Sequence, residues 1–313
     1  MKDFAGKIAV ITGGGTGMGR ELARALSAEG CSVAICDVSE ANMAETARLC
    51  RAAAPQGTAV STFRADVAIE AEMNAFADAV RRDLDTDRIH LLFNNAGVAG
   101  GGSFVAGDRG QWERTFAICF YGVIHGVRAF LPLLKNASEA RIVNTSSVNG
   151  FWATIGADRP HTAYSAAKFA VKGFTEALIQ DLALNAPHVT CSVVMPGHIG
   201  TEISGNSMRI QGGVSDELVF SLEEQGLDPK ALGEDQIIEL ANAAFRDTAP
   251  MTAAEAARVI LDGVRAGKWR ILVGKDAEFL DQQVRADPES AYTPGFVKLL
   301  QDAGHFGNII ASE

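Results

Sequence analysis

A glycine-rich turn that joins an apolar run to an amphipathic segment is the feature that most constrains how this chain can fold. The run KIAVIT at 7–12 is short and rich in Ile and Val, as buried strands are. TGGGTGMG follows at 12–19, and apolar residues then recur at helical spacing through 17–29. In a strand, turn and helix of this kind, the glycines let the backbone approach a pyrophosphate, and the helix N-terminus offers free N–H groups. The sequence therefore predicts a dinucleotide-binding βα unit.

The glycine spacing of this turn is TGxxxGxG, which differs from GxGxxG, and no Gly-Lys-Ser/Thr ends it as in a P-loop. A flexible turn without a ligand is the alternative, but the strand before it and the helix after it favour phosphate binding. The contacts expected from the turn are Gly13, Thr16, Gly17, Met18 and Gly19.

The next apolar run, 31–37, ends in Asp37. A carboxylate at this place accepts hydrogen bonds from the adenosine ribose hydroxyls and repels a 2′-phosphate. Gly14, Gly15 and Val38 are not basic, so none of them would pair with such a phosphate. The sequence therefore favours NAD over NADP, with a solvated turn aspartate as the alternative.

Tyr164 and Lys168 stand four residues apart in YSAAK, so on a helix they share one face. An ammonium group beside a phenol favours the phenolate and lowers the pKa of the phenol. Tyr164 is therefore a candidate general acid/base near neutral pH. Because a tyrosine four residues before a lysine is common by chance, other motifs in the chain have to support a catalytic role for this pair.

Strand and helix patterns alternate along the chain, which predicts an α/β fold with a doubly wound parallel sheet, Rossmann-like, in a single domain. Residues 202–250 interrupt this alternation with helical signals at 216–225 and 228–245, as expected of a substrate-lid insertion, and 276–313 form a C-terminal extension. The expected strands are 7–12, 31–37, 58–64, 89–93, 141–145, 190–195 and 270–273, and the expected helices are 17–29, 40–53, 69–83, 111–135, 162–185 and 253–266.

Charge and composition exclude several classes of partner. The chain of 313 residues carries a net charge of −10 without a basic run, which argues against nucleic acid and anionic membranes. No stretch approaches about 18 uninterrupted apolar residues, so we expect no membrane-spanning helix. The first strand begins close to Met1 without a secretory signal, which favours a cytoplasmic protein. Five cysteines without CxxC spacing predict reduced thiols and no metal site.

Six motifs in order resemble the main short-chain branch of the short-chain dehydrogenase/reductase superfamily. The resemblance covers about 5–202 and resumes around 251–275. The motifs are TGGGTGMG at 12–19, DV at 66–67, NNAG at 94–97, NTSS at 144–147, YSAAK at 164–168 and PGHIGT at 196–201.

The resemblance implies roles for individual residues. Tyr164 would exchange a proton with the substrate oxygen, Lys168 would hold the nicotinamide ribose, and Ser147 would hydrogen-bond the substrate oxygen. The implied cofactor contacts beyond the glycine turn are Asp37, Asp66, Val67, Asn95, Ala96, Gly97, Tyr164, Lys168, Pro196, Gly197, Ile199 and Thr201.

The expected function is that of an NAD-dependent oxidoreductase that interconverts a secondary alcohol and a ketone, with a small molecule as substrate. The alternatives are an NADP-dependent carbonyl reductase and a cofactor-binding regulatory protein without turnover. The family pairs the helices that correspond to 111–135 and 162–185 across two-fold axes, so a homodimer or homotetramer is expected.

Two departures from the family pattern concern the site. Cys119 stands where the family has an asparagine of a water-linked proton relay, and a thiol is a weak hydrogen-bonding group. The interval between Ser147 and Tyr164 is also longer than usual, within 151–161. His161, at the end of this interval, could be a second acid/base or the residue that begins the helix.

Apolar side chains in segments that should line the pocket predict a bulky apolar or aromatic substrate. These are Phe104, Phe151, Trp152 and Met195, of which Phe151 and Trp152 could equally be packing residues.

Overall fold

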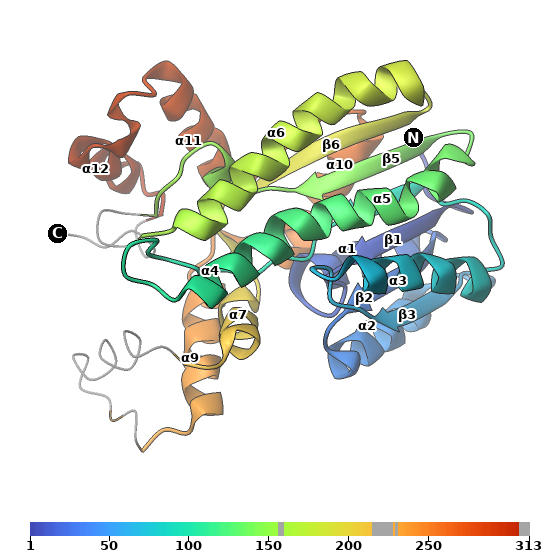
Figure 1. Cartoon of the computed structure of the whole chain (residues 1–313), viewed down its shortest axis with the longest axis horizontal. Coiled ribbons are helices and arrows are strands. Elements are labelled where there is room, and N and C mark those ends of the chain that lie inside the picture. The colour runs from blue at the N-terminus through green and yellow to red at the C-terminus, as the bar shows by residue number, and fades with distance from the viewer. Residues whose placement is uncertain (156–159, 215–227, 229–230, 307–313) are drawn as a thin grey trace.

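A parallel sheet of seven strands forms the centre of the computed structural model, which describes residues 1–155, 160–214, 228 and 231–306 (Figure 1). The strands are β1 (Ile8–Thr12), β2 (Ser32–Asp37), β3 (Val60–Arg64), β4 (Leu91–Asn94), β5 (Ala140–Thr145), β6 (Val189–Pro196) and β9 (Arg270–Val273). They lie in the order β3-β2-β1-β4-β5-β6-β9, so the direction of winding reverses between β1 and β4. The predicted α/β, doubly wound, Rossmann-like sheet is confirmed.

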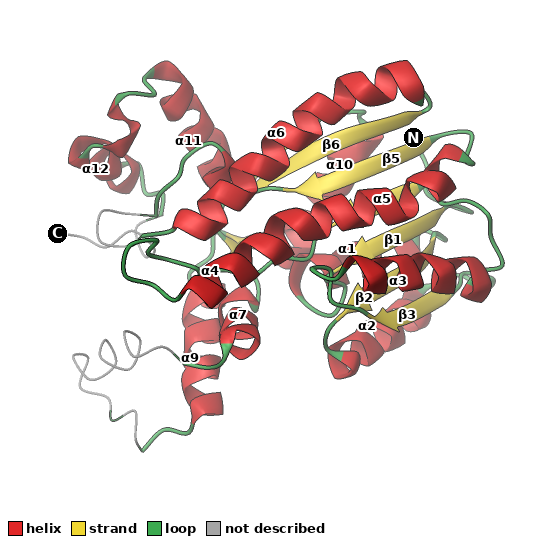
Figure 2. Ribbon diagram, viewed as in Figure 1, coloured by secondary structure: helices red, strands yellow, loops and turns green. Residues whose placement is uncertain are grey.

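The central strands β4 and β5 are buried along their whole length, because helices cover both faces of the sheet. Figure 2 shows these two layers of helices, one in front of the strands and one behind them. On one face, Phe76 and Phe130 pack with Leu92 and Ile142, whereas Leu22 and Ile260 belong to the core of the other face. The helices of the first face are α3 (Glu70–Asp83), α5 (Gly122–Lys135) and α6 (Thr162–Asn185), and those of the second are α1 (Gly17–Ala28), α2 (Glu40–Ala53) and α10 (Ala253–Arg265).

The helix expected at 111–135 begins earlier and changes its winding. It consists of α4 (Arg109–Phe116), a π-helical turn (Ala117–Tyr121) and α5. By length and composition alone, Arg109–Lys135 is apolar enough to cross a membrane, and half of its most apolar stretch is buried inside the molecule. Since α5 packs on β4, β5 and α3, this burial is that of a core helix.

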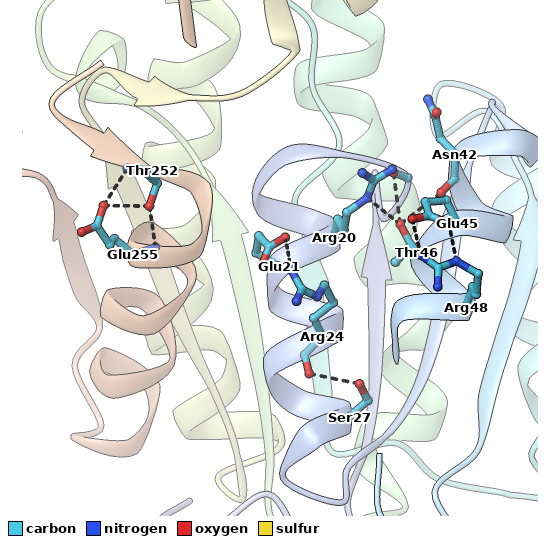
Figure 3. A network of polar contacts seen from close by, with 11 residues as sticks. Arg20, Glu21, Arg24, Ser27, Asn42, Glu45, Thr46, Arg48, Thr252 and Glu255 are labelled. Atoms are coloured by element: carbon cyan, nitrogen blue, oxygen red, sulfur yellow. Dashed lines mark hydrogen bonds and ion pairs between the residues drawn. The ribbon is translucent and has the colours of Figure 1, made fainter. Parts of the chain in front are cut away.

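The insertion contains helices α7 (Ile203–Gln211) and α9 (Glu234–Asp247), which pack against each other. The helical signal at 216–225 lies outside the described residues. Two short strands, β7 (Ile199–Gly200) and β8 (Met251–Thr252), pair where the insertion leaves and rejoins the core. They were not predicted, because two residues are too few for a periodic pattern. At Thr252 a capping box with Glu255 begins α10 (Figure 3).

The extension after β9 folds into α11 (Lys275–Ala286) and α12 (Pro294–Asp302). In Figure 1 these dark red helices lie together at one end of the sheet, beside the segment that precedes α6. They bury a third apolar core that includes Leu280, Phe296 and Leu300 from the extension and Trp152 from that segment.

Candidate active site

The glycine turn lies between β1 and α1, at the point where the strand order reverses. The backbone of this turn packs closely against the backbone of the segment after β4. Gly13 has φ +65°, and a Cβ on it would lie 2.8 Å from the Cα of Ala96. Thr16, before the first residue of α1, makes no side-chain cap, so the helix N-terminus offers N–H groups. Ligands bind at such reversal points of α/β sheets, and anions bind at such helix ends.

Hydrogen bonds connect this turn to the segment after β4. The amides of Asn95 and Ala96 both donate to Thr12 Oγ1, at 3.0 and 3.1 Å. The Nδ2 of Asn95 donates to the carbonyl oxygens of Thr12 and Gly13, at 3.1 and 3.3 Å. Asn95 therefore holds the two sides of the site together.

A cleft of about 580 Å³ opens over these two segments. Its size suits a dinucleotide, since ligand pockets span about 300–1,000 Å³. Its lining contains the predicted contacts Gly13, Thr16, Gly17, Met18, Asp37, Asp66, Val67, Asn95, Ala96, Gly97 and Thr201. The glycine turn, the ends of β2 and β4 and the turn after β6 thus meet in one place, and the residues present fit a dinucleotide.

Six of the predicted cofactor contacts do not line this cleft and stay predictions: Gly19, Tyr164, Lys168, Pro196, Gly197 and Ile199. A Cβ on Gly19 would lie 2.0 Å from the carbonyl oxygen of Gly13, so Gly19 lets α1 pack closely on the turn. Pro196 and Gly197 form the end of β6 and the turn behind the cleft, and Ile199 is buried in β7. Thr201, which follows them in the same motif, lines the cleft.

Asp37 faces the cleft from the end of β2 and binds backbone amides. Its Oδ2 accepts from Gly15 N at 3.0 Å, and its Oδ1 accepts from Ser39 N at 3.0 Å. Arg20 is a nearby cation that the sequence did not single out. It donates from Nη2 to the carbonyl oxygen of Gly15 at 2.6 Å and from Nε to Thr46 Oγ1 at 3.0 Å (Figure 3). Arg20 therefore stabilises the glycine turn by linking Gly15 to Thr46.

Asp66 lies at the same end of the cleft and is paired. Its Oδ2 accepts from Arg114 Nη2 at 2.5 Å, and its Oδ1 accepts from the amide of Ala68 at 2.9 Å. The Asp66–Arg114 ion pair is close to neutral, so Asp37 supplies the negative charge at this end of the cleft.

The three predicted catalytic residues meet beside the cleft. Ser147 lies near enough to the Tyr164 phenol to act on its pKa, in the lowering direction. The Nζ of Lys168 lies 5.4 Å from the centre of the Tyr164 ring and donates to the carbonyl oxygen of Thr145 at 2.9 Å. It is also 3.5 Å from the position that a Cβ on Gly97 would take, so the lysine reaches the edge of the cleft.

The expected lowering of the pKa of Tyr164 is wrong as a net effect. Burial raises the pKa above its ordinary value, and the Lys168 ammonium and the Ser147 hydrogen bond oppose this without cancelling it. The phenol is therefore protonated at neutral pH, which is the form that donates a proton to a carbonyl oxygen.

Cys119 lies in the π-helical turn and is fully buried. Its Sγ donates to the carbonyl oxygen of Val98 at 3.2 Å, so the thiol is engaged with the segment beside the cleft. π-helical turns are frequent at functional sites, and this one brings Cys119 within 3.8 Å of the position a Cβ on Gly97 would take. The thiol packs at the place of the family's asparagine.

His161 lies at the start of α6, and its ring is 4.8 Å from that of Tyr164. Burial lowers the pKa of His161 from its ordinary value to about 4. The imidazole is therefore neutral at pH 7 and packs on the ring that would carry the proton.

The low pKa of His161 predicts a loss of stability in acid. As the pH falls below the ordinary value of about 6.5, the unfolded chain binds a proton that the folded protein refuses until about pH 4. We expect His161→Gln to lessen the decrease in unfolding free energy between pH 7 and pH 5, measured by urea denaturation. His188→Gln is the matched control, and equal slopes for both variants and the wild type would contradict the assignment.

None of the four residues expected to offer apolar surface to the pocket lines this cleft. Trp152 is 1% exposed and packs against Phe296, and Phe151 packs on the same C-terminal core. Met195 is fully buried in β6, and Phe104 is largely exposed at the surface. The apolar residues that do line the cleft are Met18, Val38, Ala65, Val67, Ala96, Val98, Ile118, Ile203 and Ile210.

Helix α7 closes one side of the cleft, as expected of a lid. Asn206 Nδ2 donates to Thr16 Oγ1 at 2.9 Å, Ser207 Oγ accepts from Ala99 N at 2.8 Å, and Gln211 Nε2 donates to the carbonyl oxygen of Ala99 at 2.6 Å. These polar residues of the insertion were missed, because no motif marks them.

A model of the short chain dehydrogenase family matches residues 7–211. The chain belongs to this family. Among its relatives, the oxidoreductase SadH of Mycobacterium tuberculosis, whose name states no substrate, is 37% identical over 91% of this chain and 92% of SadH. Levodione reductase of Leifsonia aquatica is 30% identical over 66% of this chain and 74% of its own length. A short-chain dehydrogenase/reductase of Burkholderia phymatum, solved in complex with NAD, matches with a TM-score of 0.75 at 31% identity, covering 93% of this chain and 95% of that one. This short-chain dehydrogenase is thus an oxidoreductase.

Proposed function

We propose that this short-chain dehydrogenase uses NAD to interconvert a secondary alcohol and a ketone. The observation that carries the proposal is the meeting of Ser147, Tyr164 and Lys168 beside a dinucleotide cleft, with the Lys168 Nζ 5.4 Å from the centre of the Tyr164 ring. A regulatory protein without turnover would not need these three groups together.

The chemistry follows from these groups. A bound nicotinamide would supply or accept the hydride. In reduction, the Tyr164 phenol donates its proton to the carbonyl oxygen, and Ser147 hydrogen-bonds the same oxygen as negative charge develops on it. In oxidation, the proton of the alcohol passes to Tyr164. Lys168 favours the phenolate that is left after donation.

The choice of NAD is supported by the acidic end of the cleft. Asp37 lines this end, and Asp66 and Arg114, which also line it, offset each other's charge. A 2′-phosphate beside Asp37 would be repelled. Arg20 favours the alternative, NADP, only if its guanidinium leaves Gly15 and Thr46.

A bulky apolar or aromatic substrate is supported by the apolar lining near the site. Val98, Ile118, Ile203 and Ile210 offer apolar surface, whereas Arg209, the cation on α7, lies near Asp235. A single cation rarely suffices to bind phosphate groups. The name of levodione reductase, a relative of the chain, also points to reduction of a ketone.

A substrate panel tests the proposal. The purified protein is assayed with NAD or NADP against small alcohols, sugars, sugar phosphates, and aryl or alicyclic secondary alcohols and ketones. We expect the highest kcat/KM for an aryl or alicyclic compound with NAD. A highest value for a sugar phosphate or an ethanol-sized alcohol would contradict the substrate class, and comparable values with NADP would contradict the cofactor.

Assembly as a cytoplasmic homodimer or homotetramer is part of the proposal. Tyr121 and Phe169 leave the π-helical turn and α6 with exposed aromatic side chains, 49% and 41% exposed, which a second copy could cover. A monomeric mass in solution at micromolar concentration would contradict this.

Cys119→Asn restores the residue type of the family's proton relay. We expect cofactor binding to persist and the pH dependence of kcat to change, because an amide holds water better than a thiol does. Cys119→Ala removes the thiol without adding an amide and serves as the control. If the pH profiles of all three proteins coincide, Cys119 has a packing role alone.

A further inference from the structure

The segment that follows Ser147 rests on α11 and α12, which lie outside the family-matched residues 7–211. Trp152 is the largest side chain through which this segment contacts the two helices. It is 1% exposed, its ring lies 6.0 Å from that of Phe296 and 6.3 Å from that of Phe306, and its Nε1 donates to the carbonyl oxygen of Ala291 at 2.7 Å. The indole is thus fixed both by packing and by a buried hydrogen bond.

Asn149 connects the fixed Trp152 to Ser147 through hydrogen bonds. Its buried Nδ2 donates to the carbonyl oxygens of Trp152 and Thr154, both at 2.9 Å. Its backbone amide donates to Ser147 Oγ at 3.1 Å. A continuous series of contacts therefore runs from Ala291 through Trp152 and Asn149 to the hydroxyl that Tyr164 contacts.

The helices that hold Trp152 are themselves fixed to the sheet. Asp281 of α11 accepts two hydrogen bonds from Arg270 of β9, one of them from Nη1 to Oδ2 at 2.9 Å, and Arg285 Nε adds a third contact at 3.0 Å. Burial opposes the ionisation of Asp281, but these hydrogen bonds outweigh it and lower the pKa of Asp281. The ion pair thus stays charged at neutral pH and anchors α11 at the edge of the sheet.

We propose that residues 275–302, the C-terminal brace, position Ser147 through Trp152 and Asn149. The proposal rests on the proposed function in that it takes Ser147 as the group that binds the substrate oxygen. Trp152 touches neither Tyr164 nor the cleft and acts as a positioning residue. Because a displacement of about 1 Å costs up to about 100-fold in rate, a brace on this segment has a direct effect on turnover.

Trp152→Phe tests the brace, since it keeps an aromatic ring and removes the N–H that binds Ala291. Trp269→Phe is the matched control, because Trp269 is 46% exposed and its ring makes no contact with Trp152. We expect amide hydrogen exchange of 147–154 to become about fivefold faster in Trp152→Phe, as the loss of one hydrogen bond predicts, and to stay unchanged in Trp269→Phe. Equal exchange in Trp152→Phe and the wild type would overturn the proposal.

Kinetics then show whether the brace acts through Ser147. We expect kcat of Trp152→Phe to fall about tenfold with an unchanged KM for NAD. In a Ser147→Ala background the same substitution should cause no further decrease, as a double-mutant cycle measures. Faster exchange with unchanged kcat, or a full additional loss in the Ser147→Ala background, would overturn the positioning role.

The two proposals fail in different ways. If the wild-type protein oxidises and reduces no compound of the panel, the proposed function fails, while the exchange measurement still decides whether the brace holds the segment. Tyr292→Phe is a milder second variant, in case Trp152→Phe does not fold. It removes the hydroxyl that accepts from Ala153 N at 3.2 Å, and it should speed exchange of the same segment.

Discussion

Tyr164→Phe is expected to lower kcat by at least about 10²- to 10⁴-fold, the range that general acid/base groups contribute. The substitution keeps the ring that packs on His161 and removes the only proton that Tyr164 can transfer. Because the tyrosine stands beside the dinucleotide cleft and not among its lining residues, the dissociation constant of NADH should change little. Single-turnover kinetics and fluorescence titration of NADH measure the two quantities.

Tyr121→Phe is the control for this change, because Tyr121 is half exposed and lies in the π-helical turn. Its kcat should match that of the wild type. A Tyr164→Phe protein with kcat within a few-fold of the wild type would show that another group transfers the proton, and His161 would then be the first to examine.

Asp37→Ser is expected to reduce kcat/KM for NAD by about ten- to a hundredfold, since hydrogen bonds to a charged group contribute about 1.5–3 kcal/mol. The same change removes the charge that repels a 2′-phosphate, so kcat/KM for NADP should rise. Steady-state kinetics with both cofactors give the ratio. An unchanged preference would mean that Asp37 only holds Gly15 and Ser39.

A substitution of Arg20 separates two causes of the expected gain in kcat/KM for NADP. In Asp37→Ser the Arg20 guanidinium still binds the carbonyl oxygen of Gly15 in the turn, so part of the gain with NADP should disappear in the double variant Asp37→Ser, Arg20→Ala. Asp78→Ser, on the exposed side of α3, is the control and should leave both cofactors unaffected. If kcat/KM for NADP stays raised without Arg20, the gain comes only from the loss of repulsion by Asp37.

The sequence predicted the sheet because its signals are local, and equally local signals singled out the candidate catalytic residues. An apolar run, a glycine turn and a four-residue spacing each fix the geometry of a few neighbouring residues, and the strand order then brings Asp37, Asn95 and Ser147 to one edge. Gly19 and Ile199 belong to these motifs without lining the cleft, because a motif shows which residues are near a ligand and not which of them face it.

Tertiary contacts explain the other differences. The pKa of Tyr164 depends on how deeply α6 is covered, which the sequence near YSAAK does not contain. Trp152 meets Ala291 across 139 residues of chain, so nothing near Phe151 distinguishes a pocket wall from a packing residue. The hydrogen bonds of Asn206 and Gln211 depend on how α7 docks on the cleft, and side-chain amides of this kind carry no periodic signal.

The pairing of Ile199 with Met251 and of Gly200 with Thr252 has an evolutionary consequence. Both ends of the insertion are fastened side by side, and beyond them the capping box of α10 restarts the core. Since the entropy of closing a loop grows only slowly with its length, residues between such fastened ends can be lengthened, shortened or exchanged at little cost to the sheet. The insertion beside the cleft can therefore diverge independently, while the candidate catalytic residues Ser147, Tyr164 and Lys168 stay where they are.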